Sequence, residues 1–202
     1  DYQLTNPVGS GAYISIGHAQ NIKICGPGTI DANGMVAYSD GTDTKIRSIN
    51  LEYTDNVVLE DILIKDSNSW GVHIYRSDNF TARHVKLFSG KDGFDPDASR
   101  DVLLEDIFVQ SYDDAVAVKA RSTREGETTE RVTVRRAIVS SVKSLLKIGT
   151  ETRMLMQDIL FEDCDVFDGE RGIVLYARDG GPIDGITWRN IRLFMVDWPD
   201  ES

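Results

Sequence analysis

Apolar and polar positions alternate in short segments along most of the chain, and a similar segment occurs seven times. Alternation with a period of two residues is typical of β-strands. Successive copies begin 35, 23, 22, 30, 27 and 27 residues apart, and several begin with Asn or Asp. The copies occupy residues 21–30, 56–66, 79–88, 101–111, 131–141, 158–168 and 185–195.

A second strand signal recurs between these copies, at residues 70–77, 92–99, 113–120, 144–151 and 171–178. Many short strands at a variable interval predict an all-β solenoid, the parallel β-helix. A single coil cannot bury its apolar face alone and stacks on its neighbours, while insertions go into turns. We predict one such domain over residues 1–202, or a truncated fragment of one. A β-sandwich is the alternative. It is less favoured because the copies resemble one another and hairpin turn dipeptides are scarce.

The composition argues against some classes of partner. The 202 residues are 41% hydrophobic and 27% charged, as in ordinary globular proteins. A net charge of −11 argues against a nucleic-acid partner, which needs a basic surface. No apolar run is long enough to span a bilayer, and we expect a monomer without a membrane partner.

The chain starts without Met and shows no signal peptide, so we expect a mature form or a fragment. For Cys25 and Cys164, two buried free thiols are favoured over a disulfide.

The spacing of three aspartates matches the repeat. Asp92 and Asp114 are 22 residues apart, which is also the interval between the copies that begin at Asn79 and Asp101. In a parallel β-helix the two would stack on adjacent coils, about 4.8 Å apart, with Asp113 as the diagonal neighbour. The sequence therefore predicts that three carboxylates converge on one patch.

The alternation within residues 113–120 predicts which side chains face outward. Val116 and Val118 should point into the core. Asp114 has the same parity, so it must sit at a turn or bulge to reach the patch. The outer face should have a floor of small residues walled by charge: Ala115, Ala117 and Lys119, with Asp95 opposite Ala117.

Acids at strand ends are often only turn formers, since Asp-Gly and Asp-Pro are turn dipeptides. Converging carboxylates repel each other, however, and so need a reason. One reason is calcium, which takes several oxygen ligands. Another is glycoside hydrolysis, which needs one protonated acid and one ionised base. Mutual repulsion supplies both states, because it keeps one carboxyl protonated.

Several motifs resemble the polygalacturonase family of glycoside hydrolases, family 28. They are GKDGFDP at 90–96, DDAVAVK at 113–119, IGTE at 148–151 and GPGTIDANG at 26–34. The resemblance covers most of the chain. It implies a right-handed parallel β-helix and a secreted or periplasmic enzyme that hydrolyses cell-wall polysaccharide such as pectin, with no cofactor or metal.

The resemblance also implies roles for the three aspartates. Asp113 would be the general acid that protonates the leaving oxygen. Asp92 and Asp114 would activate the attacking water. The reaction would invert the anomeric configuration, for which acid and base usually lie roughly 6.5–9.5 Å apart.

The chain departs from the family pattern in two places. The family's histidine falls at Ser144, and the two cations that grip a uronate carboxylate are replaced by Val174 and Tyr176. With a net charge of −11, we expect a neutral or differently decorated glycan to be preferred over polygalacturonate. A different grip could come from Lys119, Lys147, Arg121 and Arg178, although solvated side chains are an equal alternative.

Other candidate substrate contacts surround the patch. His73 lies one coil before Asp95 and could bind a hydroxyl, and Glu151 with Arg153 could replace the missing histidine. Aromatic rings that could flank the cleft are Trp70, Tyr75 and Tyr112. Two other functions stay open. One is a β-helix that binds carbohydrate without catalysis. The other is a calcium-dependent polysaccharide lyase that uses Lys119 or Arg121 as its base.

Overall fold

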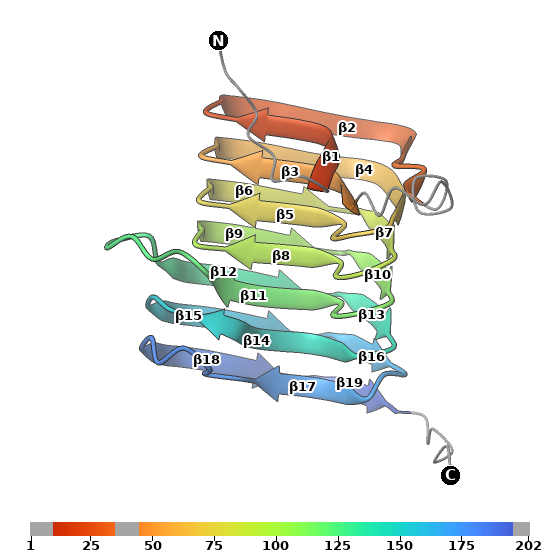
Figure 1. Ribbon diagram of the computed structural model, residues 1–202. Coiled ribbons are helices and arrows are strands. Elements are labelled where there is room, and N and C mark those ends of the chain that lie inside the picture. Colours follow the sequence, from red (N-terminus) through yellow and green to blue (C-terminus); the bar gives the residue numbers. More distant parts are fainter. Residues whose placement is uncertain (1–9, 35–44, 196–202) are drawn as a thin grey trace.

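The computed structural model describes residues 10–34 and 45–195, which wind into a parallel β-helix (Figure 1). The seven-stranded sheet that faces the viewer in Figure 1, here called sheet A, has the order β1-β3-β5-β8-β11-β14-β17. Its strands are β1 Ser10–Gly17, β3 Lys45–Glu52, β5 Val72–Tyr75, β8 Phe94–Asp97, β11 Val116–Ala120, β14 Ser144–Thr152 and β17 Arg171–Leu175.

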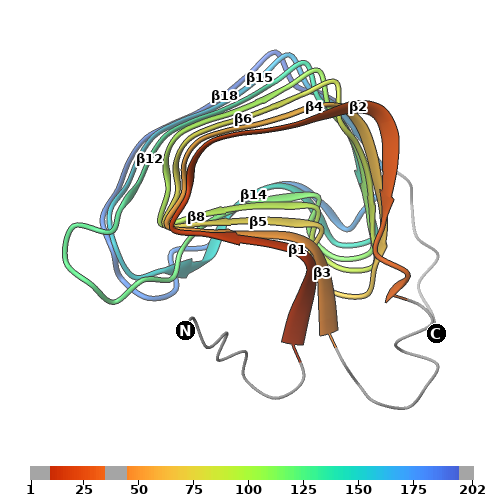
Figure 2. The ribbon, with the colours of Figure 1, turned by 90° about the horizontal axis from the view of Figure 1, so that it is seen from above.

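The remaining strands complete each coil. The two long strands are β2 Gln20–Asp31 and β4 Asp55–Ser67, and β4 pairs with both β6 and β7. In later coils the same stretch is split at a bend, so a coil has three faces when seen along the axis (Figure 2). The split strands are β6 Asp78–Arg83, β7 Lys86–Ser89, β9 Arg100–Glu105, β10 Phe108–Ser111, β12 Thr129–Arg135, β13 Ile138–Ser141, β15 Met156–Glu162, β16 Asp165–Phe167, β18 Ile183–Arg189 and β19 Arg192–Phe194.

The polar residues that begin the repeats form one corner of the coil. Asn56, Asn79 and Asp101 have φ of 54°, 53° and 58°, in the left-handed region that Asn and Asp tolerate best. The side chain of Asn56 donates to Asn21 Oδ1 at 2.7 Å in an exposed position. These residues are therefore turn residues on the outside of the helix, not an inward polar ladder.

One apolar cluster fills the helix from β3 to β16. Its largest side chains, which include Phe80, Phe94 and Phe161, are fully buried. Burial of each such side chain stabilises the fold by about 1.5–3 kcal/mol. The core thereby fixes the register of the coils, on which the outer-face residues depend.

The predicted fold is confirmed. Neighbouring strands pair in parallel, which excludes a β-sandwich. Seen from above, the chain turns clockwise as it descends, so the helix is right-handed (Figures 1 and 2). Both cysteines are free, but Cys25 is exposed, so only Cys164 is a buried thiol. Among the described residues, no helix has the length and apolarity needed to cross a membrane. The chain start, on which the expectation of a mature form rests, lies outside the described residues.

Candidate active site

A single ladder of residues crosses sheet A where its strands begin. Four backbone hydrogen bonds define it: Ser48 to Trp70, Gly71 to Asp92, Gly93 to Asp114 and Ala115 to Ser144, each from N–H to carbonyl oxygen at 2.8–3.3 Å. The entry ladder therefore runs through Arg47, Trp70, Asp92, Asp114 and Ser144, and it continues to Arg171, which pairs in register with Ser144. Asp92 and Asp114 lie in bends before β8 and β11, so Asp114 reaches the patch from a turn, as predicted.

The structure brings the three predicted catalytic aspartates together. One carboxylate oxygen each of Asp92, Asp113 and Asp114 lies within 4.8 Å of the others. This separation is shorter than the roughly 6.5–9.5 Å expected for an inverting pair. The cause is the coil itself, because residues on adjacent coils stack about 4.8 Å apart.

The surroundings push the pKa values of two of these acids in opposite directions. Burial alone would raise the pKa of Asp92, but the Lys119 ammonium, 2.5 Å from its Oδ2, outweighs burial and lowers it. The pKa of Asp113 is raised by partial burial and then by the charges of Asp92 and Asp114. Its side chain is 39% exposed, and Lys91 lies no closer than 3.8 Å. Asp113 therefore holds a proton more readily than Asp92 does.

The two outward lysines serve as counter-ions inside the site. Lys147 Nζ lies 2.5 Å from Asp114 Oδ2, and Lys119 Nζ lies 2.5 Å from both Asp92 Oδ2 and Asp95 Oδ1. Lys119 is only 3% exposed, with the Trp70 ring centroid 4.0 Å from its Nζ. Both ammonium groups are therefore already engaged with acids of the site.

Two other predicted contacts lie beneath the surface. Asp95 is fully buried, and burial, only partly offset by Lys119, raises its pKa well above the ordinary value. His73 is 3% exposed, and burial lowers its pKa to about 4, so the ring is neutral near neutral pH. The Trp70 ring packs edge-on against the His73 ring with the centroids 4.9 Å apart.

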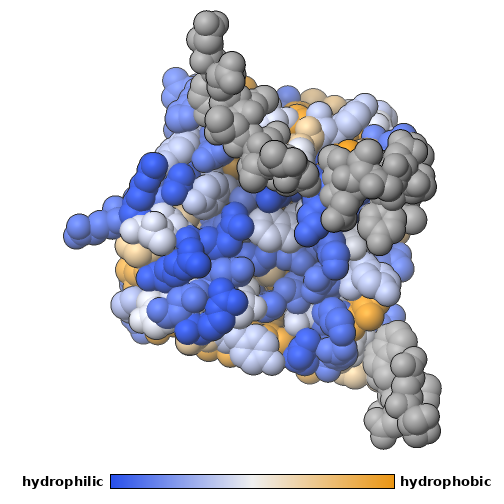
Figure 3. All heavy atoms as spheres, viewed as in Figure 1, coloured by the Kyte–Doolittle hydropathy of each residue, from blue (hydrophilic) through white to orange (hydrophobic). Residues whose placement is uncertain are grey.

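The predicted floor of small residues is wrong in part. Ala115 packs into the apolar core instead of facing outward, because the bend before β11 shifts the alternation so that it starts at Val116. Ala117 is fully buried as well. The face over sheet A is mostly hydrophilic in Figure 3.

Apart from Lys147, the candidates from the C-terminal coils do not join the aspartate cluster. Ser144 begins β14, next to Asp114 on the entry ladder, whereas Glu151 lies near the other end of that strand. Glu151 therefore does not fill the position of the missing histidine, and Arg153, which donates to the Arg121 carbonyl at 3.1 Å, does not either. Arg178 is exposed and pairs with Asp179 at 3.2 Å.

The backbone of β14 is irregular between these two ends. The β11–β14 register shifts between Val118 and Ala120. Gly149 lies at this shift with φ of 95°, and a Cβ there would be 2.3 Å from the Tyr176 carbonyl oxygen. Only glycine fits this position. Val174 stands directly beside Lys147 on β17, where the resemblance placed a lost cation.

The predicted aromatic residues divide between two places. Trp70 and Tyr75 are half-buried in the layer over sheet A. Tyr112 is 64% exposed and lines a groove of about 510 Å³ with Phe88 and Val142, next to Asp113 in sequence. Tyr112 is thus free to contact a ligand at the edge of the site.

The aspartates could also hold a metal ion, since they offer three clustered carboxylate oxygens. Calcium prefers six to eight oxygen ligands. Lys119 and Lys147 already neutralise Asp92 and Asp114 at 2.5 Å. A cation would have to displace these ammonium groups, so the donor set fits a metal poorly.

Sequence reasoning missed two residues. Arg47 continues the entry ladder beyond Trp70, with its Cζ 4.9 Å from the Trp70 ring centroid. Asp97 is fully buried and binds Arg121 Nε at 2.5 Å. The repeat interval held the signal, because Arg47 precedes Trp70 by 23 residues, the interval between the copies at Asn56 and Asn79.

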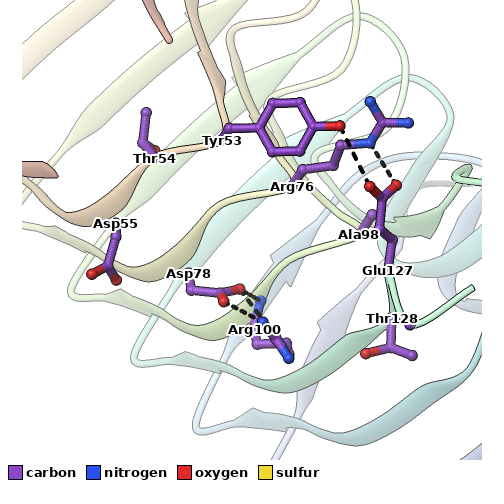
Figure 4. Close-up of a pocket in the computed structure, with 10 residues that line it drawn as sticks. Tyr53, Thr54, Asp55, Arg76, Asp78, Ala98, Arg100, Glu127 and Thr128 are labelled. Carbon is purple, nitrogen blue, oxygen red and sulfur yellow. Dashed lines mark hydrogen bonds and ion pairs between the residues drawn. The ribbon is translucent and has the colours of Figure 1, made fainter. Parts of the chain in front are cut away.

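A second hollow, of about 290 Å³, lies at the other end of the sheet A strands. Residues 121–128, between β11 and β12, form part of its wall. Figure 4 shows Glu127 reaching Arg76, whose Nε is 2.7 Å from Glu127 Oε2, and Tyr53, whose hydroxyl is 3.4 Å from Glu127 Oε1. These contacts tie the segment to two earlier coils.

Comparison with known proteins gives consistent results. The family model described as glycosyl hydrolases family 28 matches residues 2–199. A probable polygalacturonase of Vitis vinifera is 26% identical over 85% of this chain and 38% of its own length. An endo-polygalacturonase of Pectobacterium carotovorum subsp. carotovorum is 24% identical over 96% of this chain and 53% of its own. The chain thus spans about half the length of these relatives, or less.

A solved structure shares the fold. The polygalacturonase from Erwinia carotovora ssp. carotovora superposes with a TM-score of 0.68 at 22% identity, over 91% of this chain and 54% of that one. The fold agrees with the right-handed β-helix described above. Because the family model matches nearly the whole chain, this protein belongs to the glycosyl hydrolases family 28.

Proposed function

We propose that this chain carries the catalytic centre of a glycoside hydrolase that cleaves O-glycosidic bonds in a pectin-type polysaccharide. The proposal rests mainly on one observation. In the carboxylate cluster the pKa of Asp113 is raised, whereas the pKa of Asp92 is lowered. Groups whose pKa values are pushed apart by their surroundings are the natural acid and base of such a reaction. The names of the relatives, which are polygalacturonases, support the substrate class.

In the proposed reaction Asp113 donates its proton to the leaving glycosidic oxygen as the C–O bond breaks. Water held by Asp92 and Asp114 attacks the anomeric carbon, and its proton passes to one of these carboxylates. Lys119 lowers the pKa of Asp92, and the contacts of Lys119 with Asp92 and of Lys147 with Asp114 hold both carboxylates in place. Asp113 is the most exposed of the three, so it can reach a sugar bound on the surface.

A calcium-dependent lyase is less favoured. Such an enzyme needs a neutral base, and Lys119 was a candidate. Burial would lower the pKa of Lys119, but Asp95 and Asp92 outweigh burial and raise it. Lys119 therefore stays charged and cannot accept a proton near neutral pH.

The setting of the proposed enzyme follows from the same class of substrate. Cell-wall polysaccharide lies outside the cytoplasm, so we propose that the protein is secreted or periplasmic. We further propose that residues 1–202 act as one domain and as a monomer, with the glycan as the partner and no nucleic acid.

The test is release of reducing sugar from a panel of pectic and neutral polysaccharides. The wild-type chain should act on at least one pectic member, and Asp113→Asn should lower that activity by about 10²-fold or more. Asp184→Asn, which changes an exposed aspartate on β18, is the matched control and should act like the wild type. A carbohydrate-binding protein without catalysis would instead bind one of the glycans and release no sugar.

A further inference from the structure

Arg47 is a cation without a counter-ion. Among the described residues, no carboxylate lies within ion-pair distance of its guanidinium, and its Nε is buried without a hydrogen-bond partner. Burial lowers the pKa of Arg47 and the nearby Arg121 lowers it further, while the charges of Asp95 and Asp97 offset this only in part. A half-buried cation beside a like charge is unfavourable unless a ligand supplies the missing anion.

Arg121 is the second cation at this place, and it is held rigidly. Its Nε donates to Asp97 Oδ2 at 2.5 Å and its backbone N–H to Asp97 Oδ1 at 2.9 Å. Its terminal nitrogen lies 3.2 Å from His73 Nε2. Although anchored, the side chain keeps 29% of its surface exposed.

Both guanidinium groups flank one aromatic ring. The Cζ atoms of Arg47 and Arg121 lie 4.9 Å and 4.8 Å from the centroid of Trp70. Rings that stack on a guanidinium hold its plane in one orientation. The anchored segment in Figure 4 adds to this, because Glu127 fixes the residues that follow Arg121.

The position of this pair relative to the aspartates is set by the entry ladder. Trp70 is one coil from Asp92, and Arg47 is two coils away, on the side of the N-terminal coils. Coils repeat about every 4.8 Å, so a glycan lying along the ladder would pass from the aspartates to Arg47 within a few sugar units. On the other side, the ladder cation is Arg171, which already pairs with Glu170 at 2.9 Å, and Val174 and Tyr176 offer none.

We propose that Arg47 and Arg121 form a subsite for the carboxylate of a uronic acid residue in the substrate, on the N-terminal side of the scissile bond. The proposal rests on the function proposed above and names the charged part of its substrate. With this subsite, the expected preference for a neutral sugar applies only to the part of the substrate that lies toward Val174 and Tyr176, on the C-terminal side of the aspartates. A planar guanidinium suits this task, since it binds a carboxylate through two parallel hydrogen bonds.

The test measures binding and not turnover, so it is independent of hydrolysis. The chain carries Asp113→Asn in all samples, and calorimetry measures its affinity for an oligogalacturonate and for the same oligosaccharide with its carboxylates methyl-esterified. Arg47→Gln should weaken binding of the acidic oligosaccharide about tenfold or more, the effect of losing a charge-assisted contact. Binding of the ester should change less than about twofold.

Lys86→Gln is the matched control, because it removes the same charge from an exposed position on β7, in another sheet. It should leave both affinities unchanged. Three results would overturn the proposed subsite. Arg47→Gln could weaken binding of the acid and the ester equally, or it could have the same effect as Lys86→Gln. The protein could also bind the acidic oligosaccharide no more tightly than the ester. Failure of the proposed function would look different, since Asp113 in the wild-type chain would then give no hydrolysis while acidic binding persisted.

Discussion

The replacement Asp97→Asn should destabilise the protein in a pH-dependent way. Burial alone would raise the pKa of Asp97, but its bonds to His73 and Arg121 outweigh burial and lower the pKa to about 2, from the ordinary 3.8. Each pKa unit corresponds to roughly 1.4 kcal/mol, so the ionised carboxylate contributes about 2 kcal/mol to the free energy of unfolding. A depressed pKa stabilises the fold above the unfolded pKa of the group. The contribution is lost as the pH falls from about 4 to about 2.

The assay is urea unfolding followed by tryptophan fluorescence, repeated from neutral to acidic pH. The wild type should exceed Asp97→Asn by about 2 kcal/mol or more near neutral pH, because the variant also leaves Arg121 without its partner. The difference should shrink below about pH 4. Asp184→Asn is again the control and should show no such trend. A difference that is absent near neutral pH, or that is constant over the whole range, would refute the assigned ion pairs.

Three further outcomes follow from the site. Lys119→Met leaves the buried Asp92 and Asp95 without their cation and should cost roughly 3–5 kcal/mol of unfolding free energy; a urea-measured loss below about 1 kcal/mol would contradict the pairing. EDTA should leave the hydrolysis rate unchanged, whereas activity lost in chelator and restored by calcium would favour a lyase. The family resemblance, and not the carboxylate separation of at most 4.8 Å, predicts that the first product seen by NMR has the inverted anomeric configuration. A retained product would mean that one aspartate acts as a nucleophile.

The repeat and the acid cluster were readable from the sequence because both depend on coil length. Asp92 and Asp114 are separated by one coil of 22 residues without an insertion, so simple addition stacks them. The chemistry of carboxylates in contact then limits the functions that fit. Assignment of Asp113 as the acid came from the family resemblance, and its raised pKa supports that assignment.

Burial of the outer-face residues could not be read from alternation. Parity places His73, Asp95 and Lys119 on the outside of the strand, yet all three are at most 3% exposed. Long side chains from neighbouring coils lie over them; Trp70, for example, contacts both Lys119 and His73. Such layering depends on rotamers and ion pairs, which the period of a strand does not encode.

The long-range contacts of residues 121–128 could not be predicted from the sequence for a similar reason. Residues 121–128 look like an ordinary insertion, but Glu127 contacts Tyr53, which lies 74 residues earlier. The pairing of Arg121 with Asp97 is likewise a side-chain event across coils. Arg121 was already a candidate for the grip, but its pairing with Asp97 and its place beside Arg47 became visible only with the structure.

The most direct measurement of the central claim compares two leaving groups in Asp113→Asn. Natural polysaccharide needs a proton on its leaving oxygen, whereas a 4-nitrophenyl glycoside of the same sugar leaves without one. If Asp113 is the general acid, kcat/KM on the polysaccharide should fall by about 10² or more, with only about a tenfold loss or less on the nitrophenyl substrate. Equal losses on both substrates, or more than about a tenth of wild-type activity on the polysaccharide, would contradict the assignment.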